Sequence, residues 1–119
     1  MTLEKPKYRK TRHTGLPADF TELAEMFEEA FELLDVFESS ARLKMLFSMY
    51  REPCNKSDLR RLVNPKLVYE NLTILQERML IEELSDGRFD LTEMGKRILR
   101  QYLQFLENLR RTMWEIQEL

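Results

Sequence analysis

The chain has 119 residues, of which 43% are apolar, and this size predicts one globular domain with appended segments. One cysteine, Cys54, and one histidine, His13, exclude an intrachain disulfide and a zinc site, and no apolar run approaches the roughly 20 residues that cross a bilayer. The first residues are too polar for a secretory signal, so we expect a cytoplasmic protein. We also expect that the protein needs no cofactor.

The net charge of −2 hides an uneven distribution along the chain. Residues 1–20 hold five bases and two acids, residues 21–39 seven acids and no base, and residues 40–66 seven bases and two acids. Residues 67–95 are acidic, with two bases and seven acids, and residues 96–119 hold five bases and three acids. An acidic helix therefore separates two cationic blocks, which indicates a polarised molecule.

Residues 1–16 are predicted to form a basic flexible arm, which is either a solvated tail or a segment that touches phosphates or a minor groove. Pro17 or Asp19 then begins a helix over 17–38. Its apolar residues recur every three or four positions, as in a coiled-coil seam: Phe20, Leu23, Phe27, Ala30, Leu34 and Phe37. This seam predicts an N-terminal dimerisation helix.

The segment 39–92 is predicted to hold three helices and a hairpin. The first helix runs from Ser40 to Tyr50, after the break at Ser39. Helical spacing predicts that most of it is buried, with Met45 and Met49 behind an inner stripe of Leu43, Leu46, Phe47 and Tyr50.

A short second helix and a third helix follow. Asn55 or Ser57 can cap the second, Lys56 to Leu62, which is expected to bury Leu59 and Leu62. Asn64 as the cap and Pro65 at the first helical position begin the third helix at once. The inner face of the third helix is predicted to carry Val68, Leu72, Leu75 and Leu80.

Asp86 and Gly87 can adopt the two positive φ angles of a type I′ turn, so Leu80–Leu84 and Arg88–Leu91 are predicted to form a hairpin. Thr92 then caps a helix over 93–119, roughly 40 Å long at 1.5 Å per residue. Its apolar stripe is Ile98, Tyr102, Phe105, Leu109, Met113 and Ile116. A helix longer than the domain can cover predicts contact with another chain; the alternative is that both terminal helices pack only on their own core.

This order of helices, turn and hairpin is that of a winged helix-turn-helix. The runs ARLKMLFSM and KSDLRRLVNPKLVYENLTILQERMLIEELSDGRFDLTEMGKRIL resemble winged-helix transcriptional regulators of the ArsR, MarR and PadR kind, especially small archaeal ones. The matching positions are Leu72, Leu75, Leu80 and Ile81 at the end of the recognition helix, and Phe89, Leu91, Thr92 and Gly95 after the wing. The resemblance covers Ala41 to about Leu99. It implies a mostly α fold with a small β-hairpin wing, a winged helix-turn-helix flanked by N- and C-terminal dimerisation helices.

We therefore expect a sequence-specific regulator that binds double-stranded DNA as a homodimer. Lys66 and Tyr69, in the first turns of the third helix, would read base edges, and Asn71 could read adenine if it faces outward. Lys56, Arg60 and Arg61 would clamp phosphates, whereas the acidic wing could approach DNA only at its tip. The candidate DNA-binding residues are Lys56, Arg60, Arg61, Lys66, Tyr69, Glu70, Thr73 and Arg88. The candidate dimerisation residues are Phe20, Leu23, Phe27, Leu34, Tyr102, Phe105, Leu109, Met113 and Ile116.

Two further interpretations stay open: a non-specific, chromatin-like DNA-binding protein, and a winged-helix adaptor that binds proteins and not DNA. An enzyme is not expected, because the chain lacks a glycine-rich phosphate loop and Cys54 has no histidine or acid at a recognisable spacing. Cys54 is expected to be a plain surface thiol, with redox sensing as the alternative. The sequence predicts neither a membrane partner nor a small-molecule ligand.

Overall fold

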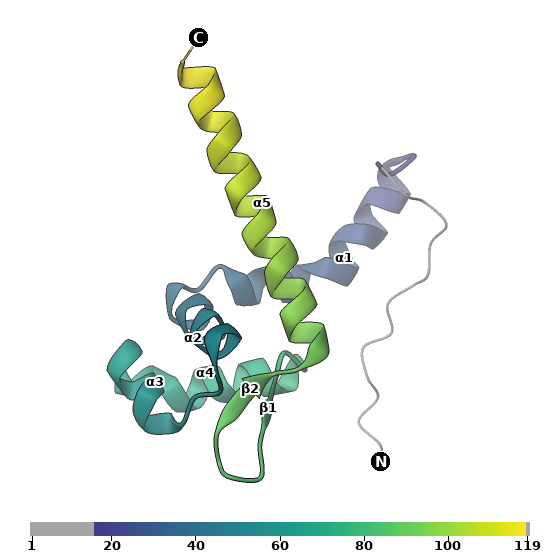
Figure 1. The fold of residues 1–119 in the computed structure, drawn as a ribbon. Helices are drawn as coiled ribbons and strands as arrows, with labels where there is room; N and C mark the ends of the chain where they lie inside the picture. The colour runs from purple at the N-terminus through teal and green to yellow at the C-terminus, as the bar shows by residue number, and fades with distance from the viewer. Residues whose placement is uncertain (1–15, 119) are drawn as a thin grey trace. The chain divides into compact units, whose positions relative to one another are not determined.

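The computed structural model describes residues 16–118, and its contacts divide the chain into two units, 1–35 and 36–119. The elements are α1 (Phe20–Phe37), α2 (Ser40–Arg51), α3 (Lys56–Leu62), α4 (Pro65–Glu77), β1 (Ile81–Glu83), β2 (Phe89–Leu91) and α5 (Glu93–Gln117) (Figure 1). The prediction of a mostly helical fold with one small hairpin is confirmed. The arm predicted at 1–16 lies, except for Leu16, outside the described residues. Within 16–118 no helix combines the length and the apolar content that a bilayer span requires.

Most of α1 lies in the first unit, and Asp19 sets its start. The backbone N–H of Glu22 donates to Asp19 Oδ1 at 2.9 Å, and Glu22 Oε2 accepts from the backbone N–H of Ala18 at 2.7 Å. Asp19 therefore caps the helix, and the side chain of Glu22 holds the residue before the cap, so the helix begins after Asp19 and not at Pro17. The seam residues Phe20 and Phe27 are 88% and 56% exposed.

The second unit builds one core from all of its elements. Its fully buried side chains are Val36, Met45, Leu46, Met49, Leu59, Val68, Leu75, Leu80 and Leu99. The inner face predicted for α4 is confirmed for Val68, Leu72 and Leu75, which are buried. Leu80 is also buried, but it lies beyond the end of α4 at Glu77.

The inner stripe predicted for α2 is wrong in part. Met45 and Met49 lie in the core, whereas Phe47 and Tyr50 are 48% and 37% exposed. Both sets have helical spacing, and the flexible methionines fill the irregular space between the helices and the hairpin. Phe47 instead lines an open apolar groove with Leu43 and Leu103. Leu62, predicted to be buried, is 40% exposed because it is the last residue of α3.

Four polar side chains cap the helices of this unit, and of these Asn64 and Thr92 are the predicted caps and Asn55 is one of two predicted candidates. Ser39 caps α2, and Asn55 forms a full capping box with Asp58 at the start of α3. Asn64 Oδ1 accepts from the N–H of Lys66, with Pro65 next to the cap, and Thr92 Oγ1 accepts from the N–H of Gly95. Each such cap stabilises a helix by about 1 kcal/mol.

The hairpin pairs Ile81 with Leu91 and Glu83 with Phe89, but its predicted type I′ turn is wrong. Of the described residues only Met79 and Gly87 have positive φ, so Asp86 does not. The N–H of Gly87 donates to Leu84 O at 3.0 Å, and the N–H of Leu84 donates to Arg88 O at 2.7 Å. The loop therefore has three residues, a turn followed by a left-handed glycine, which is the next most common way to connect a hairpin.

Cys54 adds a third backbone segment to the hairpin. Its N–H donates to Phe89 O at 2.9 Å, and the N–H of Phe89 donates to Cys54 O at 2.7 Å. This bridge turns the side chain inward, so Cys54 is only 3% exposed and the expected surface thiol is wrong.

The end of α4, the hairpin and the start of α5 meet at one joint. Met79 has a φ of 62°, its N–H donates to Gln76 O, and the N–H of Leu80 donates to Leu75 O, which together form a Schellman motif. Thr92 ties the hairpin's other end to the same place, since its N–H donates to Leu80 O at 3.0 Å and its Oγ1 to Met79 O at 2.6 Å.

Gly95 permits this close approach. A Cβ atom at this position would lie 2.1 Å from Leu80 O. Gly95→Ala is therefore expected to lower the free energy of unfolding by about 3 kcal/mol or more, since overpacking against backbone cannot be relieved by a rotamer change. Chemical denaturation monitored by circular dichroism measures this.

Gly87→Ala is the matched control for Gly95→Ala. Gly87 has a φ of 85° and no heavy atom within 4 Å of its added Cβ, so only left-handed backbone strain of about 1 kcal/mol opposes the change. An equal decrease in the free energy of unfolding in the two variants would contradict the steric role of Gly95.

Candidate nucleic-acid interface

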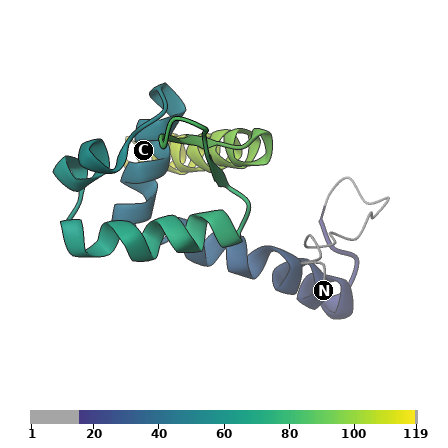
Figure 2. The same cartoon turned by 90° about the horizontal axis from the view of Figure 1, so that it is seen from below.

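The candidate interface lies on α3 and on the first turns of α4. The two helices contact each other, and Leu59 of α3 and Val68 of α4 are both buried. Figure 2 shows the short connection from α3 to α4. The cap at Asn64 and the proline after it start α4 immediately, so only two residues separate the helices. The exposed face of the first turns of α4 carries Lys66, Leu67, Tyr69 and Glu70.

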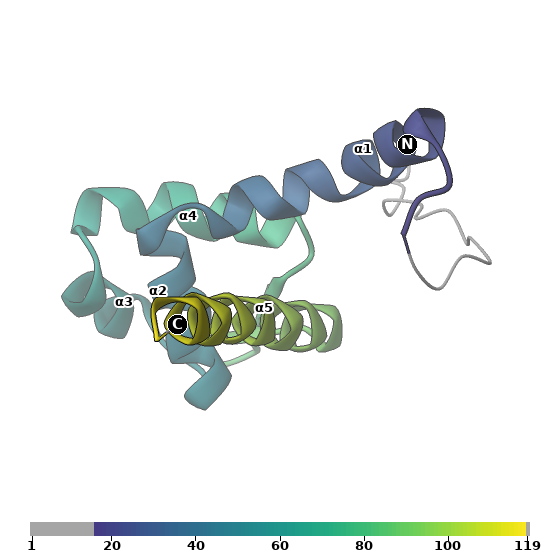
Figure 3. The same ribbon diagram turned by 90° about the horizontal axis from the view of Figure 1, so that it is seen from above.

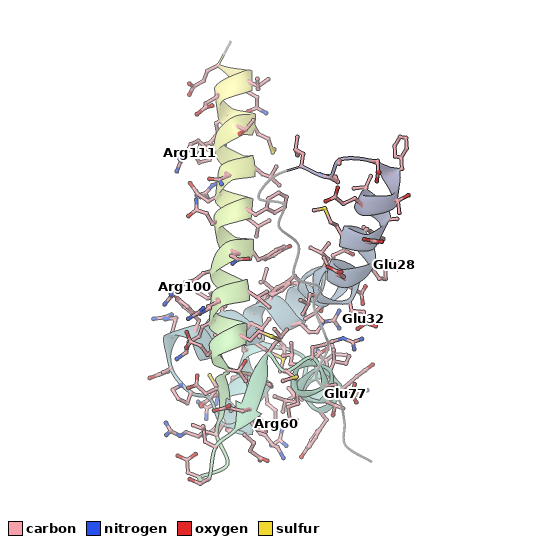
Figure 4. All side chains as sticks on the ribbon, turned by 90° about the vertical axis from the view of Figure 1, so that its right-hand side faces the viewer. Glu28, Glu32, Arg60, Glu77, Arg100 and Arg111 are labelled. Atoms are coloured by element: carbon pink, nitrogen blue, oxygen red, sulfur yellow. The ribbon has the colours of Figure 1, made fainter. Side chains whose placement is uncertain are left out.

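Lys56 and Arg60 of α3 converge on Tyr69 of α4, and we call these three residues the Tyr69 cluster. Lys56 Nζ lies 4.8 Å and Arg60 Cζ 5.8 Å from the centroid of the Tyr69 ring. Arg60 Nη2 also donates to Tyr69 Oη at 3.4 Å. The ring is 56% exposed, so the cluster lies at the surface, and Arg60 is labelled in Figure 4.

The other predicted helix residues lie around this cluster. Arg61 is exposed and its Nη2 donates to Ser57 Oγ at 3.2 Å, within α3. Glu70 and Thr73 are exposed on α4, and Thr73 Oγ1 donates to Tyr69 O at 3.0 Å. Because that bond uses its proton, the Thr73 hydroxyl can offer a ligand only its lone pairs or its methyl group.

Arg88 lies apart from the helix residues, at the tip of the hairpin. Its Nε forms an ion pair with Asp86 Oδ2 at 2.7 Å. The backbone N–H and then the side chain of Arg88 hold the pKa of the Asp86 carboxyl below its usual value. With Glu82 and Glu83 also exposed, the hairpin presents little positive charge.

Asn71 does not belong to the interface. It is 5% exposed, and its Oδ1 accepts from Arg42 Nη1 at 3.4 Å. Arg42 Nε donates in turn to Val36 O at 2.9 Å, so the pair links α2, α4 and the end of α1 inside the second unit. The condition for an adenine contact, that Asn71 faces outward, is therefore not met. The signal was present in the sequence, because Asn71 lies three residues after Val68 and four before Leu75, on the buried face.

The stripe predicted on α5 is mostly exposed. Phe105, Leu109, Met113 and Ile116 are 54%, 45%, 59% and 63% exposed. Tyr102 instead stacks on Phe37 of the same chain, with ring centroids 4.6 Å apart. The far half of α5 extends away from α2, α3 and the hairpin in Figure 1, and Figure 3 looks down on its C-terminal end.

The sequence gives no sign of a second tyrosine–arginine pair, which joins α2 to α5. Arg100 Nε donates to Tyr50 Oη at 2.8 Å, and Arg100 Cζ lies 5.7 Å from the Tyr50 ring centroid. This hydrogen bond raises the pKa of the Arg100 guanidinium. Arg100 and Arg111 project from the same side of α5 (Figure 4). The residues are 50 positions apart, so only the packing of α2 on α5 reveals the pair.

No protein-family model, curated protein or solved structure matches this chain. Among the described residues no group of three or more histidine, cysteine, aspartate or glutamate side chains could hold a metal ion. The arrangement of α3 and α4 is therefore the basis on which a function is inferred.

The Cys54 thiol provides a test of the packing beside this interface. Burial is the main cause that raises its pKa; its Sγ lies 3.2 Å from Ser48 Oγ and donates to Glu52 O at 3.3 Å. Because the thiolate is the reactive form, iodoacetamide is expected to alkylate the native protein far more slowly than the urea-unfolded chain. The native rate should also rise at a higher pH than that of a free cysteine. Mass spectrometry of timed samples measures both, and equal native and unfolded rates would contradict the burial.

Proposed function

We propose that this chain is a sequence-specific, double-stranded DNA-binding transcriptional regulator of the winged helix-turn-helix kind that acts as a homodimer. The observation that carries the proposal is the group of cations on α3 and at the start of α4: Lys56, which is half-buried, and Arg60, Arg61 and Lys66, which are exposed. Phosphate contacts by such cations supply most of the affinity of DNA-binding proteins.

The connection between α3 and α4 supports a helix-turn-helix assignment. Two residues separate these helices, and the N-terminal turns of α4 are exposed while its later inner face is buried. In helix-turn-helix proteins the second helix presents its N-terminal residues to base edges in the major groove. Lys66, exposed in the first turn of α4, is therefore our candidate for reading guanine.

The charge of the hairpin favours contact through the helices and not through the wing. Arg88 is neutralised by Asp86, and the strands add the exposed acids Glu82 and Glu83. Acidic groups this close to phosphate oppose binding. In our proposal the hairpin supports α4 and approaches DNA only at its tip.

The exposed apolar stripes on α1 and α5 favour a second copy of the chain as the partner. Large side chains such as Phe27, Phe105 and Met113 are each more than half exposed. Apolar seams at heptad spacing are the usual surfaces of paired helices. A two-fold dimer would space two DNA half-sites by about one helical turn or a multiple of it, on a pseudo-palindromic site.

The experiment that tests the DNA-binding proposal is selection of a preferred site from a randomised duplex pool, followed by fluorescence anisotropy at a series of salt concentrations. Arg60→Ala with Arg61→Ala is expected to weaken binding to the preferred site and to random DNA alike. The slope of log affinity against log salt should fall by about 1 to 2, since each phosphate contact accounts for about 0.9.

Arg88→Ala is the control for this pair, and we expect a smaller effect on both affinity and slope. A larger effect of Arg88→Ala would show that the wing, and not α3, is the main phosphate contact. Absence of binding to any duplex at low salt would reject DNA binding and favour a protein adaptor. Equal affinity for selected and random DNA would mark a chromatin-like protein.

The dimer is tested by light scattering at micromolar concentration, where we expect twice the mass of the chain. Phe105→Glu with Leu109→Glu should dissociate or unfold the protein, because each carboxylate would be buried in an apolar seam. Gln104→Glu, a change at an exposed position on the same helix, should leave the mass unchanged. A monomer mass for the unaltered chain would reject the dimer.

A further inference from the structure

Two cations lie one helical turn apart on α3, and neither has an acidic partner within residues 16–118. Lys56 and Arg60 are four residues apart, a spacing at which like charges repel each other on a helix surface. Among the described residues no carboxylate forms an ion pair with either of them. Asp58, which lies between them in sequence, is occupied because its Oδ2 accepts from the N–H of Asn55 at 3.1 Å.

The ring of Tyr69 supports these two cations in the way that an acidic side chain would in an ion pair. The face of an aromatic ring carries partial negative charge and attracts cations within about 6 Å of its centroid. Lys56 Nζ and Arg60 Cζ lie at 4.8 and 5.8 Å, and Tyr69 Oη accepts from Arg60 Nη2. The ring therefore holds both side chains in place but leaves their full positive charge for a ligand.

The three side chains together offer several hydrogen-bond donors at one exposed place. Tyr69 Oη uses a lone pair to accept from Arg60, so its own proton is available to another acceptor. An ammonium, a guanidinium and a phenol match an anion with more than one acceptor oxygen. The phosphodiester group of a nucleic-acid backbone, with two non-bridging oxygens and one negative charge, has this chemistry.

We propose that Lys56, Arg60 and Tyr69 form a binding site for one phosphodiester group of the DNA backbone, in which Tyr69 positions the two cations and donates its hydroxyl. This inference rests on the proposed function and assigns Tyr69 a role other than the base reading that its place on α4 suggested. The ring contacts α3, and to read a base it would have to leave Arg60. Tyr69 therefore acts on DNA of every sequence.

Salt-dependent binding of the full chain to random and selected duplexes tests this site with three tyrosine variants. Tyr69→Leu keeps apolar bulk but removes ring and hydroxyl, and we expect it to lower the salt slope by about 1 to 2, as does Lys56→Gln with Arg60→Gln. Tyr69→Phe keeps the ring, so its slope should stay near that of the unaltered chain while affinity falls about threefold to tenfold for the lost hydrogen bond. Tyr50→Leu removes the matched ring under Arg100 and should leave the slope unchanged.

Thermal unfolding of each variant checks that the substitutions leave the fold intact. The site is supported if Tyr69→Leu lowers the affinity for random and selected DNA alike and also reduces the slope of log affinity against log salt. An unchanged slope for Tyr69→Leu, or a loss confined to the selected sequence, would overturn it and restore Tyr69 as a base reader. Binding by the unaltered chain separates these outcomes from a failure of the proposed function, because a chain that binds no duplex at low salt rejects both.

Discussion

The close approach of Gly95 to the carbonyl oxygen of Leu80 is the constraint on which the second unit depends. Leu80 O also accepts from the N–H of Thr92, and the N–H of Leu80 closes the end of α4 on Leu75. Three elements that are separate in sequence therefore meet at one residue. This joint fixes the last turn of α4, and the exposed first turns lie at the other end of the same helix.

The cations of the proposed interface are held in a different way from the ion-paired arginines of the described surface. Other arginines among the described residues have acidic partners, for example Arg88 with Asp86, Arg97 with Glu93 and Arg110 with Glu107. On α3, by contrast, an aromatic ring supports Lys56 and Arg60. Exposed ion pairs contribute little stability, and they cancel the charge of the cation locally. An aromatic ring has no net charge, so the positive potential around the cations remains. A chain with a net charge of −2 can in this way keep one positive surface.

Local signals in the sequence predict the elements of the second unit well, because caps and turn residues act on their immediate neighbours. Ser39, Asn64 and Thr92 begin their helices at the predicted positions. The predictions failed on α2, where two sets of apolar residues both have helical spacing. They also failed at Cys54, where the backbone pairs with a strand that is distant in sequence. The exposed cations could be named in advance. Their convergence on Tyr69 could not, because it depends on how α3 packs against α4.

The backbone bridge between Cys54 and Phe89 has a consequence for how related chains can vary in length. It holds the connection between α2 and α3 against the second strand, so an added residue there would break two hydrogen bonds and displace a buried side chain. The exposed hairpin tip at Ser85 and Asp86 has no such tie to the helices. Insertions in homologues should therefore gather at this tip, where a longer loop would extend the reach of the hairpin while the helices that carry the cations keep their places.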